Sequence, residues 1–418
     1  MKSTKDNTFC IKPFTAIALK NFINNELQVA WPCCMMGNRT SVSQNADKLK
    51  IPNYAELTPE EIFKHPRMDE LRKNMLAGVR DSACQVCWEQ EDKGMTSFRL
   101  QLPENLTEEK CNNPELEEFD YTASNACNLR CRMCGPGQSN SLYIDSAFFK
   151  ENDLENSLAR ATNGGWYTPS GTARLHMVSK DSLQWQWMLE NTDKIKTLKM
   201  AGGEPFYDNN VLKLINVFIE KGHASQTELS FMTNGTLISE ELVDKLNQFR
   251  LNLHNFSIDG WGKSYNYIRY PSTFELIDEK LHLYCSKVKN IKGLIPTIVV
   301  SALNIFTIKE YTEWLMNIGK TYNTYVAIHY AEMYPFDRGT SLTSLPVYLL
   351  EDALNRLDGF LVNDMHMNNV RTMITDAIKN NKENKQKMLA EITPFDLSRN
   401  QSFKDFLDPA LVEWLTAE

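Results

Sequence analysis

The 418-residue chain lacks several features that would assign it to common protein classes. No apolar run is long enough to span a membrane, and the first residues, MKSTKDNTFC, are too polar for a secretion signal. The formal net charge of −8 leaves no broad excess of lysine and arginine to neutralise phosphates. We therefore expect a cytoplasmic protein that binds neither a membrane nor nucleic acid.

Cysteine is absent after Cys285, although the chain contains ten cysteines. Because a reducing cytoplasm keeps thiols free, clustered cysteines there are more typical of metal sites than of disulfides. The clustered cysteines form two groups, and a polar, acidic segment around residues 101–120 separates them. We expect one metal-related unit on each side of this linker.

After the linker, short β-type runs alternate with amphipathic helical runs, a pattern that indicates βα units and a parallel sheet. The predicted strands are residues 119–125, 195–201, 227–233, 251–258, 294–302 and 324–331. Between the second and third strands, Val211, Leu214, Ile215 and Phe218 have helical spacing, and Gly222 suits a helix end. The sequence predicts an α/β fold with a partial, TIM-like (β/α)6 barrel, whose chemistry lies at the C-terminal ends of the strands.

The remaining segments complete the predicted domain organisation. The sequence NGGWYTPSGT, within residues 135–180, reads as a loop that is either a lid or a surface insertion. The residues beyond Pro346 are helical in pattern and carry no motif. The predicted division is 1–100 for a cysteine-containing domain, 101–120 for the linker, 121–335 for the barrel and 336–418 for a C-terminal helical extension.

The stretch SNACNLRCRMC follows the first strand of the barrel and places Cys127, Cys131 and Cys134 within eight residues. Thiolates select zinc or iron–sulfur clusters. A structural zinc site would need a fourth ligand, such as Cys111 or a distant histidine. An iron–sulfur cubane held by three cysteines instead leaves one iron open to a substrate or cofactor. The CxxxCxxC spacing differs from the paired CxxC motifs of zinc ribbons and favours the cluster.

The segment CNLRCRMC resembles the CxxxCxxC loop of the radical S-adenosylmethionine (SAM) enzymes. In that family three cysteines hold a [4Fe-4S] cluster, and the amino and carboxylate groups of SAM chelate its open iron. The resemblance implies that Cys127, Cys131 and Cys134 are the catalytic cluster ligands. It also implies reductive cleavage of SAM to a 5′-deoxyadenosyl radical, which removes a hydrogen from the substrate, and a reductant such as flavodoxin or ferredoxin.

The segment KMAGGEP closes the second predicted strand and resembles the GGEP motif, which binds the SAM amino group in this family. Gly202 and Gly203 carry no side chain, so the backbone can approach a ligand closely. Glu204 offers an anionic acceptor to an ammonium group, and Pro205 fixes the turn. The resemblance therefore implies that these four residues bind the cofactor.

The segments MTNGT and FSIDG end the third and fourth predicted strands and resemble the family's segments at those places. By this resemblance Asn234, Ser257 and Asp259 would face the SAM ribose, its carboxylate or the substrate. The alternative for each is an Asx-type turn or a helix N-cap. Arg269, in YNYIRYPS, is a candidate contact for the SAM carboxylate on the same terms.

Two features depart from the family pattern at the adenine site. The residue before the third cysteine is usually aromatic and packs near the adenine, and here it is Met133, which is softer and more flexible. A GxIxGxxE-type adenine motif is absent from the fifth strand, where the sequence reads PTIVVSALN.

The N-terminal cysteines are Cys10, Cys33, Cys84 and Cys87, with Cys34 next to Cys33. Four thiols from three segments suit either a closed zinc site or a fully ligated cluster. The pattern through FCIKPF, LQVAWPCC and CQVCWEQEDKGMTSFR resembles the auxiliary-cluster module called the SPASM or twitch domain. That resemblance implies an auxiliary [4Fe-4S] cluster on these four cysteines, with Cys34 as an alternative to Cys33.

A closed auxiliary cluster has no open iron, which implies a role in electron transfer. The resemblance to this module implies an oxidoreductase or a post-translational modification enzyme. The module's usual company implies crosslinking, oxidation or epimerisation of a peptide or protein side chain. A small metabolite, such as a sugar or nucleotide, is the alternative substrate. Cys285 is either a hydrogen donor to a substrate radical or a core residue. The competing class is a non-catalytic zinc-binding scaffold.

Overall fold

The computed structural model describes the greater part of the chain. The described residues are 2–3, 8–21, 28–33, 56–92, 97–102, 105–122, 124–162, 182–251, 253–289, 291–333, 338–358 and 365–417. Cys34 and the segment NGGWYTPSGT lie outside these residues, so their predictions stay as they were made.

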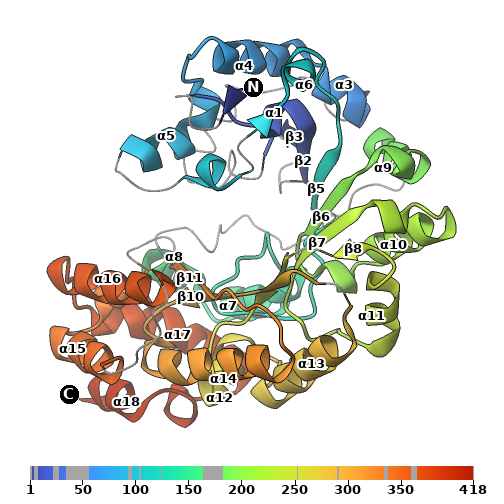
Figure 1. The fold of residues 1–418 in the computed structure, drawn as a ribbon. Helices are drawn as coiled ribbons and strands as arrows, with labels where there is room; N and C mark the ends of the chain where they lie inside the picture. The colour runs from blue at the N-terminus through green and yellow to red at the C-terminus, as the bar shows by residue number, and fades with distance from the viewer. Residues whose placement is uncertain are drawn as a thin grey trace.

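The centre of the fold is one mixed sheet (Figure 1). Its strands are β2 (Ala16–Asn21), β3 (Gln28–Trp31), β5 (Glu118–Thr122), β6 (Thr197–Ala201), β7 (Glu228–Thr233), β8 (Arg250–Leu251), β9 (Leu253–Ser257), β10 (Gly293–Val300) and β11 (His329–Glu332). Strands β11, β10, β9, β7, β6, β5, β2 and β3 lie side by side in that order, and β8 pairs with β7. Among the described strands, β11 and β3 are free edges, so the sheet does not close into a full barrel.

The six strands predicted after the linker are all present, as β5, β6, β7, β9, β10 and β11, and they pair in parallel. The predicted α/β fold with a partial barrel is therefore confirmed. Strands β2 and β3 extend the sheet beyond it: β2 runs parallel to β5 and β3 antiparallel to β2. Neither strand was predicted, because a short run between two cysteine segments gives no local signal for its distant partner.

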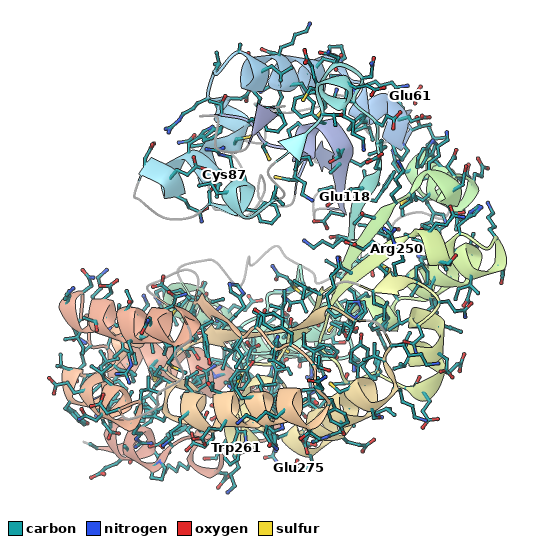
Figure 2. The ribbon with its side chains drawn as sticks, in the orientation of Figure 1. Glu61, Cys87, Glu118, Arg250, Trp261 and Glu275 are labelled. Atoms are coloured by element: carbon teal, nitrogen blue, oxygen red, sulfur yellow. The ribbon has the colours of Figure 1, made fainter. Side chains whose placement is uncertain are left out.

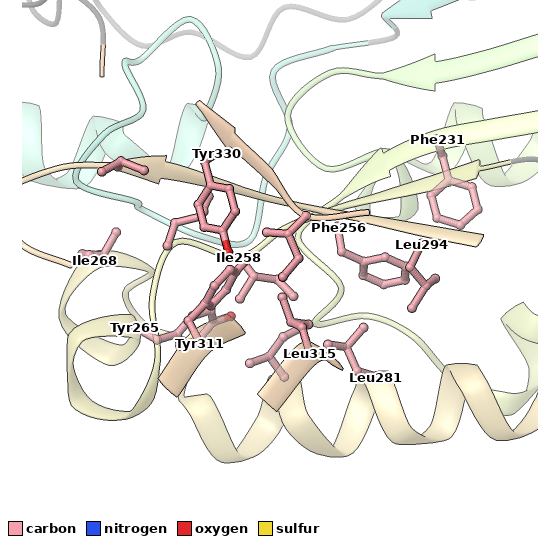
Figure 3. Close-up of a cluster of buried hydrophobic side chains, with 14 of the residues drawn as sticks. Phe231, Phe256, Ile258, Tyr265, Ile268, Leu281, Leu294, Tyr311, Leu315 and Tyr330 are labelled. Carbon is pink, nitrogen blue, oxygen red and sulfur yellow. The ribbon is translucent and has the colours of Figure 1, made fainter. Parts of the chain in front are cut away.

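Helices connect the parallel strands and cover the outer face of the sheet. They are α9 (Leu183–Glu190), α10 (Asn209–Glu220), α11 (Glu240–Leu246), α12 (Gly262–Ile268), α13 (Phe274–Lys287) and α14 (Ile308–Thr321). The helix predicted after the second strand is α10, and Val211, Leu214, Ile215 and Phe218 are buried on it as the spacing indicates. Figure 3 shows the resulting layer, in which Phe256 and Leu294 of the sheet meet Leu281 and Leu315 of the helices.

The remaining helices lie in two groups, at the top and at the lower left of Figure 1. The N-terminal group holds α1 (Lys12–Thr15), α3 (Pro59–Phe63), α4 (Pro66–Leu76), α5 (Gln85–Asp92) and α6 (Glu108–Asn112), beside a small sheet of β1 (Lys2–Ser3) and β4 (Asn105–Leu106). The C-terminal part holds α15 (Val347–Arg356), α16 (Met365–Lys379), α17 (Lys385–Arg399) and α18 (Pro409–Thr416). Helices α7 (Tyr143–Glu151) and α8 (Glu155–Ala161) follow the cysteine loop and pack against α17. No helix within the described residues is both long and apolar enough to cross a membrane.

His254, on β9, provides a test of the core. Its ring is fully buried, lies 3.9 Å from the Phe231 ring between centroids, and is hydrogen-bonded to the Tyr284 hydroxyl. Burial lowers the pKa of His254 to about 3. Since an unfolded histidine titrates near 6.5, only the unfolded chain gains this proton between those two pH values. The free energy of unfolding therefore falls on acidification through this window, by up to about 1.4 kcal/mol per pH unit.

We predict that His254→Gln, which cannot take up this proton, loses stability less steeply than wild type between pH 6.5 and pH 5. Urea unfolding at several pH values measures how the free energy of unfolding of each protein changes with pH. The difference between wild type and variant at pH 8 gives the part of the destabilisation that does not depend on pH. Equal slopes for the two proteins would show that this histidine does not titrate on unfolding.

Candidate functional site

The three cysteines of the SNACNLRCRMC stretch gather on one cavity of about 400 Å³ at the C-terminal ends of the strands. Cys127 and Cys131 are buried and Cys134 is partly exposed. The buried side chain of Leu129 packs with them. The structure thus brings together the thiols that the sequence predicted to act as one site.

The cysteine loop, residues 127–134, has no regular secondary structure, and contacts with other segments hold it. The Arg130 N–H donates to the Tyr270 carbonyl at 2.7 Å, and the Arg132 N–H donates to the Ile268 carbonyl at 2.9 Å. The Ser139 hydroxyl donates to the Leu129 carbonyl at 2.6 Å. The first two bonds tie the loop to the end of α12 and the residues that follow it, and the third ties it to Ser139.

The thiols differ in their electrostatic surroundings. Burial raises the pKa of Cys127 to about 12. A hydrogen bond from the Cys134 thiol and the nearby Arg269 guanidinium lower the pKa of Cys131 to about 7. Arg269 Nη1 lies 3.5 Å from Cys131 Sγ, so a positive charge touches the site where a thiolate ligand would carry a negative one.

This donor set fits the chemistry of an iron–sulfur cluster. Among the described residues, no group of three or more histidine, cysteine or acidic side chains is arranged to hold a single metal ion. The three thiols instead line the wall of a cavity. Thiolates are the usual ligands of such a cluster, and three of them on one cavity wall fit that donor set.

The GGEP segment packs directly against the cysteine loop. The Gly203 N–H donates to the Ser124 carbonyl at 2.9 Å, and the Glu204 N–H donates to the Ala126 carbonyl at 2.7 Å. A Cβ at Gly203 would lie 2.2 Å from the Ala126 oxygen, so only glycine permits this approach. Gly202, with φ at +145°, lines the cavity beside it.

Glu204 and Pro205 are not among the described residues that line the cavity. The Glu204 carboxylate is buried and accepts hydrogen bonds from the Thr233 hydroxyl at 2.7 Å and the Asn234 N–H at 2.6 Å. Burial raises the pKa of Glu204 to about 7. Pro205 opens the short 3-10 helix η8 (Pro205–Tyr207) and is buried. In this conformation the carboxylate joins the ends of β6 and β7, and its contact with SAM stays a prediction.

The other predicted contacts line the cavity: Met133, Asn234, Ser257, Asp259 and Arg269. Asn234 also forms the Asx-type turn, since its Oδ1 accepts the Thr236 N–H at 2.9 Å. Asp259 and Arg269 form a buried ion pair at 2.5 Å. For Asn234, the ligand-facing and the turn interpretations are therefore compatible.

Sequence reasoning missed several cavity residues at the ends of the last two strands. These are Thr297 and Val299 of β10, Glu332 of β11, and Met333 and Arg338 beyond it. Ile298 and Val300 are buried in the core, whereas Thr297 and Val299 alternate with them along β10. The only signal in the sequence is Thr297, a polar residue in an otherwise apolar strand, because Val299 and Val300 are alike in polarity. Cys285 belongs to the hydrophobic core and is not among the described residues of the cavity, which favours its interpretation as a core residue.

The four predicted N-terminal cysteines, Cys10, Cys33, Cys84 and Cys87, line one small apolar cavity of about 20 Å³ (Cys87 is labelled in Figure 2). Burial raises the pKa of Cys10 to about 11 and also raises those of Cys84 and Cys87. Cys111 packs with Cys10 in an adjoining apolar cluster. Four thiols on a single apolar cavity match the donor set of a closed site.

Residues 121–315 match the family model described as the radical SAM superfamily. This region of the chain is therefore similar to a radical SAM domain. This superfamily indicates an enzyme with SAM radical chemistry, a [4Fe-4S] cluster and SAM. A comparison with the curated proteins finds no match.

Three solved structures show some similarity to this chain. The methyltransferase TsrM from Kitasatospora setae, with cobalamin and a [4Fe-4S] cluster bound, has 11% identity and a TM-score of 0.35 over 55% of this chain and 36% of its own. Streptococcus suis SuiB bound to the precursor peptide SuiA has 12% identity and a TM-score of 0.36 over 80% of each chain. TYW1 with a lysine-pyruvate adduct has 12% identity and a TM-score of 0.28 over 57% of this chain and 70% of its own. Because these TM-scores are low, the structural similarities carry no argument about function. The similarity to a known family rests on the match of residues 121–315.

We predict that Gly203→Ala displaces the cysteine loop, because the added methyl group would overlap the Ala126 carbonyl. Overpacking of this kind costs about 1–3 kcal/mol. Iron content after anaerobic reconstitution and the melting temperature measure the effect. Gly222→Ala is the control, because its positive φ strains an added side chain although no atom lies within 4 Å of the new Cβ. It should lower the melting temperature and leave the iron content unchanged. Full iron binding by Gly203→Ala would contradict the packing argument.

Proposed function

We propose that this chain is a radical SAM enzyme that cleaves SAM to a 5′-deoxyadenosyl radical and removes a hydrogen from a peptide or protein side chain. The observation that carries the proposal is the single cavity shared by Cys127, Cys131 and Cys134 and the polar ends of β7, β9 and β10. Its size, about 400 Å³, lies in the usual range for a small-molecule site. The family match to the same part of the chain supports this assignment.

Several cavity residues have specific roles in this proposal. Cys127, Cys131 and Cys134 hold the cluster, which, once reduced, supplies the electron for cleavage of SAM. Gly202 leaves space for the ligand along the backbone, and Asn234 and Ser257 offer polar contacts. The buried Asp259–Arg269 pair keeps a fixed charge distribution beside Cys131.

We place the substrate at the far wall of the cavity, at the end of β11. Glu332 and Met333 line this cavity and also a second one, of about 280 Å³, between β11, the 3-10 helix η11 (Leu342–Ser344) and α16. The two spaces therefore share a wall. A side chain of a larger substrate could enter there while the rest remains outside.

We further propose that the N-terminal thiols hold an auxiliary [4Fe-4S] cluster, with the unit acting as a SPASM or twitch-type domain. The four cysteines on one apolar cavity support this proposal. A closed cluster would accept an electron from the substrate radical, which makes the net reaction an oxidation such as a crosslink. Return of the electron would give an epimerisation instead. A flavodoxin or ferredoxin would supply the first electron.

A small metabolite, such as a sugar or nucleotide, is the alternative substrate, because the two adjoining cavities also suit a compact molecule. The non-catalytic alternative is a scaffold with two zinc sites. It predicts a colourless protein that contains zinc, whereas the enzyme is brown and oxygen-sensitive.

We predict that the protein, reconstituted anaerobically with iron and sulfide and then given SAM and dithionite, releases 5′-deoxyadenosine, measured by liquid chromatography. Cys131→Ala should abolish release, because the cluster loses a ligand. Cys285→Ala is the matched control, since this thiol lies in the hydrophobic core, and it should retain release. A fully reconstituted wild type that never cleaves SAM would refute the proposed function.

The double variant Cys84→Ala/Cys87→Ala tests the auxiliary cluster. We predict that its iron content falls by about half, because one of two four-iron clusters is lost. SAM cleavage without substrate should persist, since the barrel thiols are untouched. Unchanged iron content would show that the N-terminal cysteines hold no cluster.

A further inference from the structure

Arg132 stands between the second and third cysteines and binds the C-terminal extension. Its guanidinium is buried, and Nη2 donates to Asp396 Oδ1 at 2.6 Å. Nη1 donates to the Ile392 carbonyl at 3.3 Å, and Nε donates to the Tyr267 carbonyl at 2.8 Å. The charged group also lies 3.5 Å from the centre of the Tyr267 ring. Each nitrogen of this guanidinium therefore has an acceptor, and two of the acceptors belong to α17.

The carbonyl groups of the same loop are bound from the same side. Arg399, at the end of α17, donates from Nη2 to the Arg130 carbonyl at 2.6 Å and forms an ion pair with Asp145 at 2.9 Å. Arg338 donates to the Arg132 carbonyl at 3.3 Å, and its own ion pair is with Glu391 of α17 at 2.5 Å. Both carbonyls thus depend on arginines that α17 carries or holds.

These contacts join residues that are far apart along the chain, since Arg132 and Asp396 are separated by 264 positions. All the charged partners are buried, with side-chain exposure of 0% for Arg399 and Asp145. Removing one partner of such a pair leaves the other charge buried and uncompensated, which disturbs its surroundings strongly. The loop has no helical or strand hydrogen bonds of its own, so its shape depends on contacts with other segments, and this buried ion-pair network is one set of them.

We propose that helix α17 sets the conformation of the cysteine loop, with Arg132, Asp396 and Arg399 as positioning residues for the cluster ligands. Helix α17 lies outside residues 121–315, so the family match does not assign it this role. The proposal rests on the proposed function in one respect, namely that the loop binds the cluster. The conformation of the loop itself can be measured without any cluster.

The first test compares Asp396→Asn with wild type in the full-length, reconstituted protein. Loss of iron to a chelator should be at least about tenfold faster in the variant, since outer-shell changes typically cost 10–100-fold in metal affinity. The control is Asp408→Asn, in the same extension: Asp408 pairs with Arg356 and caps α18. It should destabilise the extension and leave iron release at the wild-type rate. Equal iron release from both variants would overturn the proposal.

A second measurement covers the case in which Asp396→Asn folds poorly or the chain takes up no iron. Arg132→Lys keeps the positive charge and loses the fork that reaches several acceptors at once. In the iron-free chain, hydrogen–deuterium exchange at residues 127–134 should rise in Arg132→Lys and stay at the wild-type level in Asp408→Asn. Unchanged exchange in Arg132→Lys would refute the positioning role. An absence of iron binding in wild type would refute the proposed function alone. The exchange measurement would still test whether α17 sets the conformation of the loop.

Discussion

Parallel pairing of β5, β6, β7, β9, β10 and β11 puts the carboxyl end of every one of these strands at the same edge of the sheet. The register is continuous: Thr122 pairs with Ala201, Ser257 with Thr297, and Val300 with Glu332. Residues at the ends of these strands, or in the loops that follow them, therefore line the same cavity. The parallel register brings together the cysteine loop, the glycine turn after β6 and the polar ends of the later strands.

The GGEP segment and the cysteine loop depend on each other for their shape. The backbone N–H groups of Gly203 and Glu204 donate to the carbonyls of residues 124 and 126. The Glu204 carboxylate accepts hydrogen bonds from residues at the end of β7. The GGEP segment, which the sequence predicts to contact a ligand, therefore also connects the ends of β5, β6 and β7. Its glycine is required by the neighbouring backbone, whatever ligand binds beside it.

Much of this arrangement could be predicted from the sequence, and the exceptions have physical reasons. Alternation and helical spacing are local signals, so the six strands and the buried face of α10 were correct. The spacing of Cys127, Cys131 and Cys134 is likewise local. The pairing of β2 with β5 and the contact of Arg132 with Asp396 join distant segments, and neither leaves a pattern in one sequence. The direction of the Glu204 carboxylate depends on donors from β7 that spacing cannot reveal.

Strand β2 connects the two cysteine sites more rigidly than a linker would. Cys10 comes shortly before β2, Cys127 comes shortly after β5, and the two strands pair from Ala16 opposite Glu118 to Lys20 opposite Thr122. Five paired residues at 3.3 Å each extend about 16 Å, and this length forms part of the separation between the two groups of thiols. Electron tunnelling depends steeply on distance. Under the proposed function, in which both sites hold clusters, this strand pair would set part of the distance that an electron crosses between them.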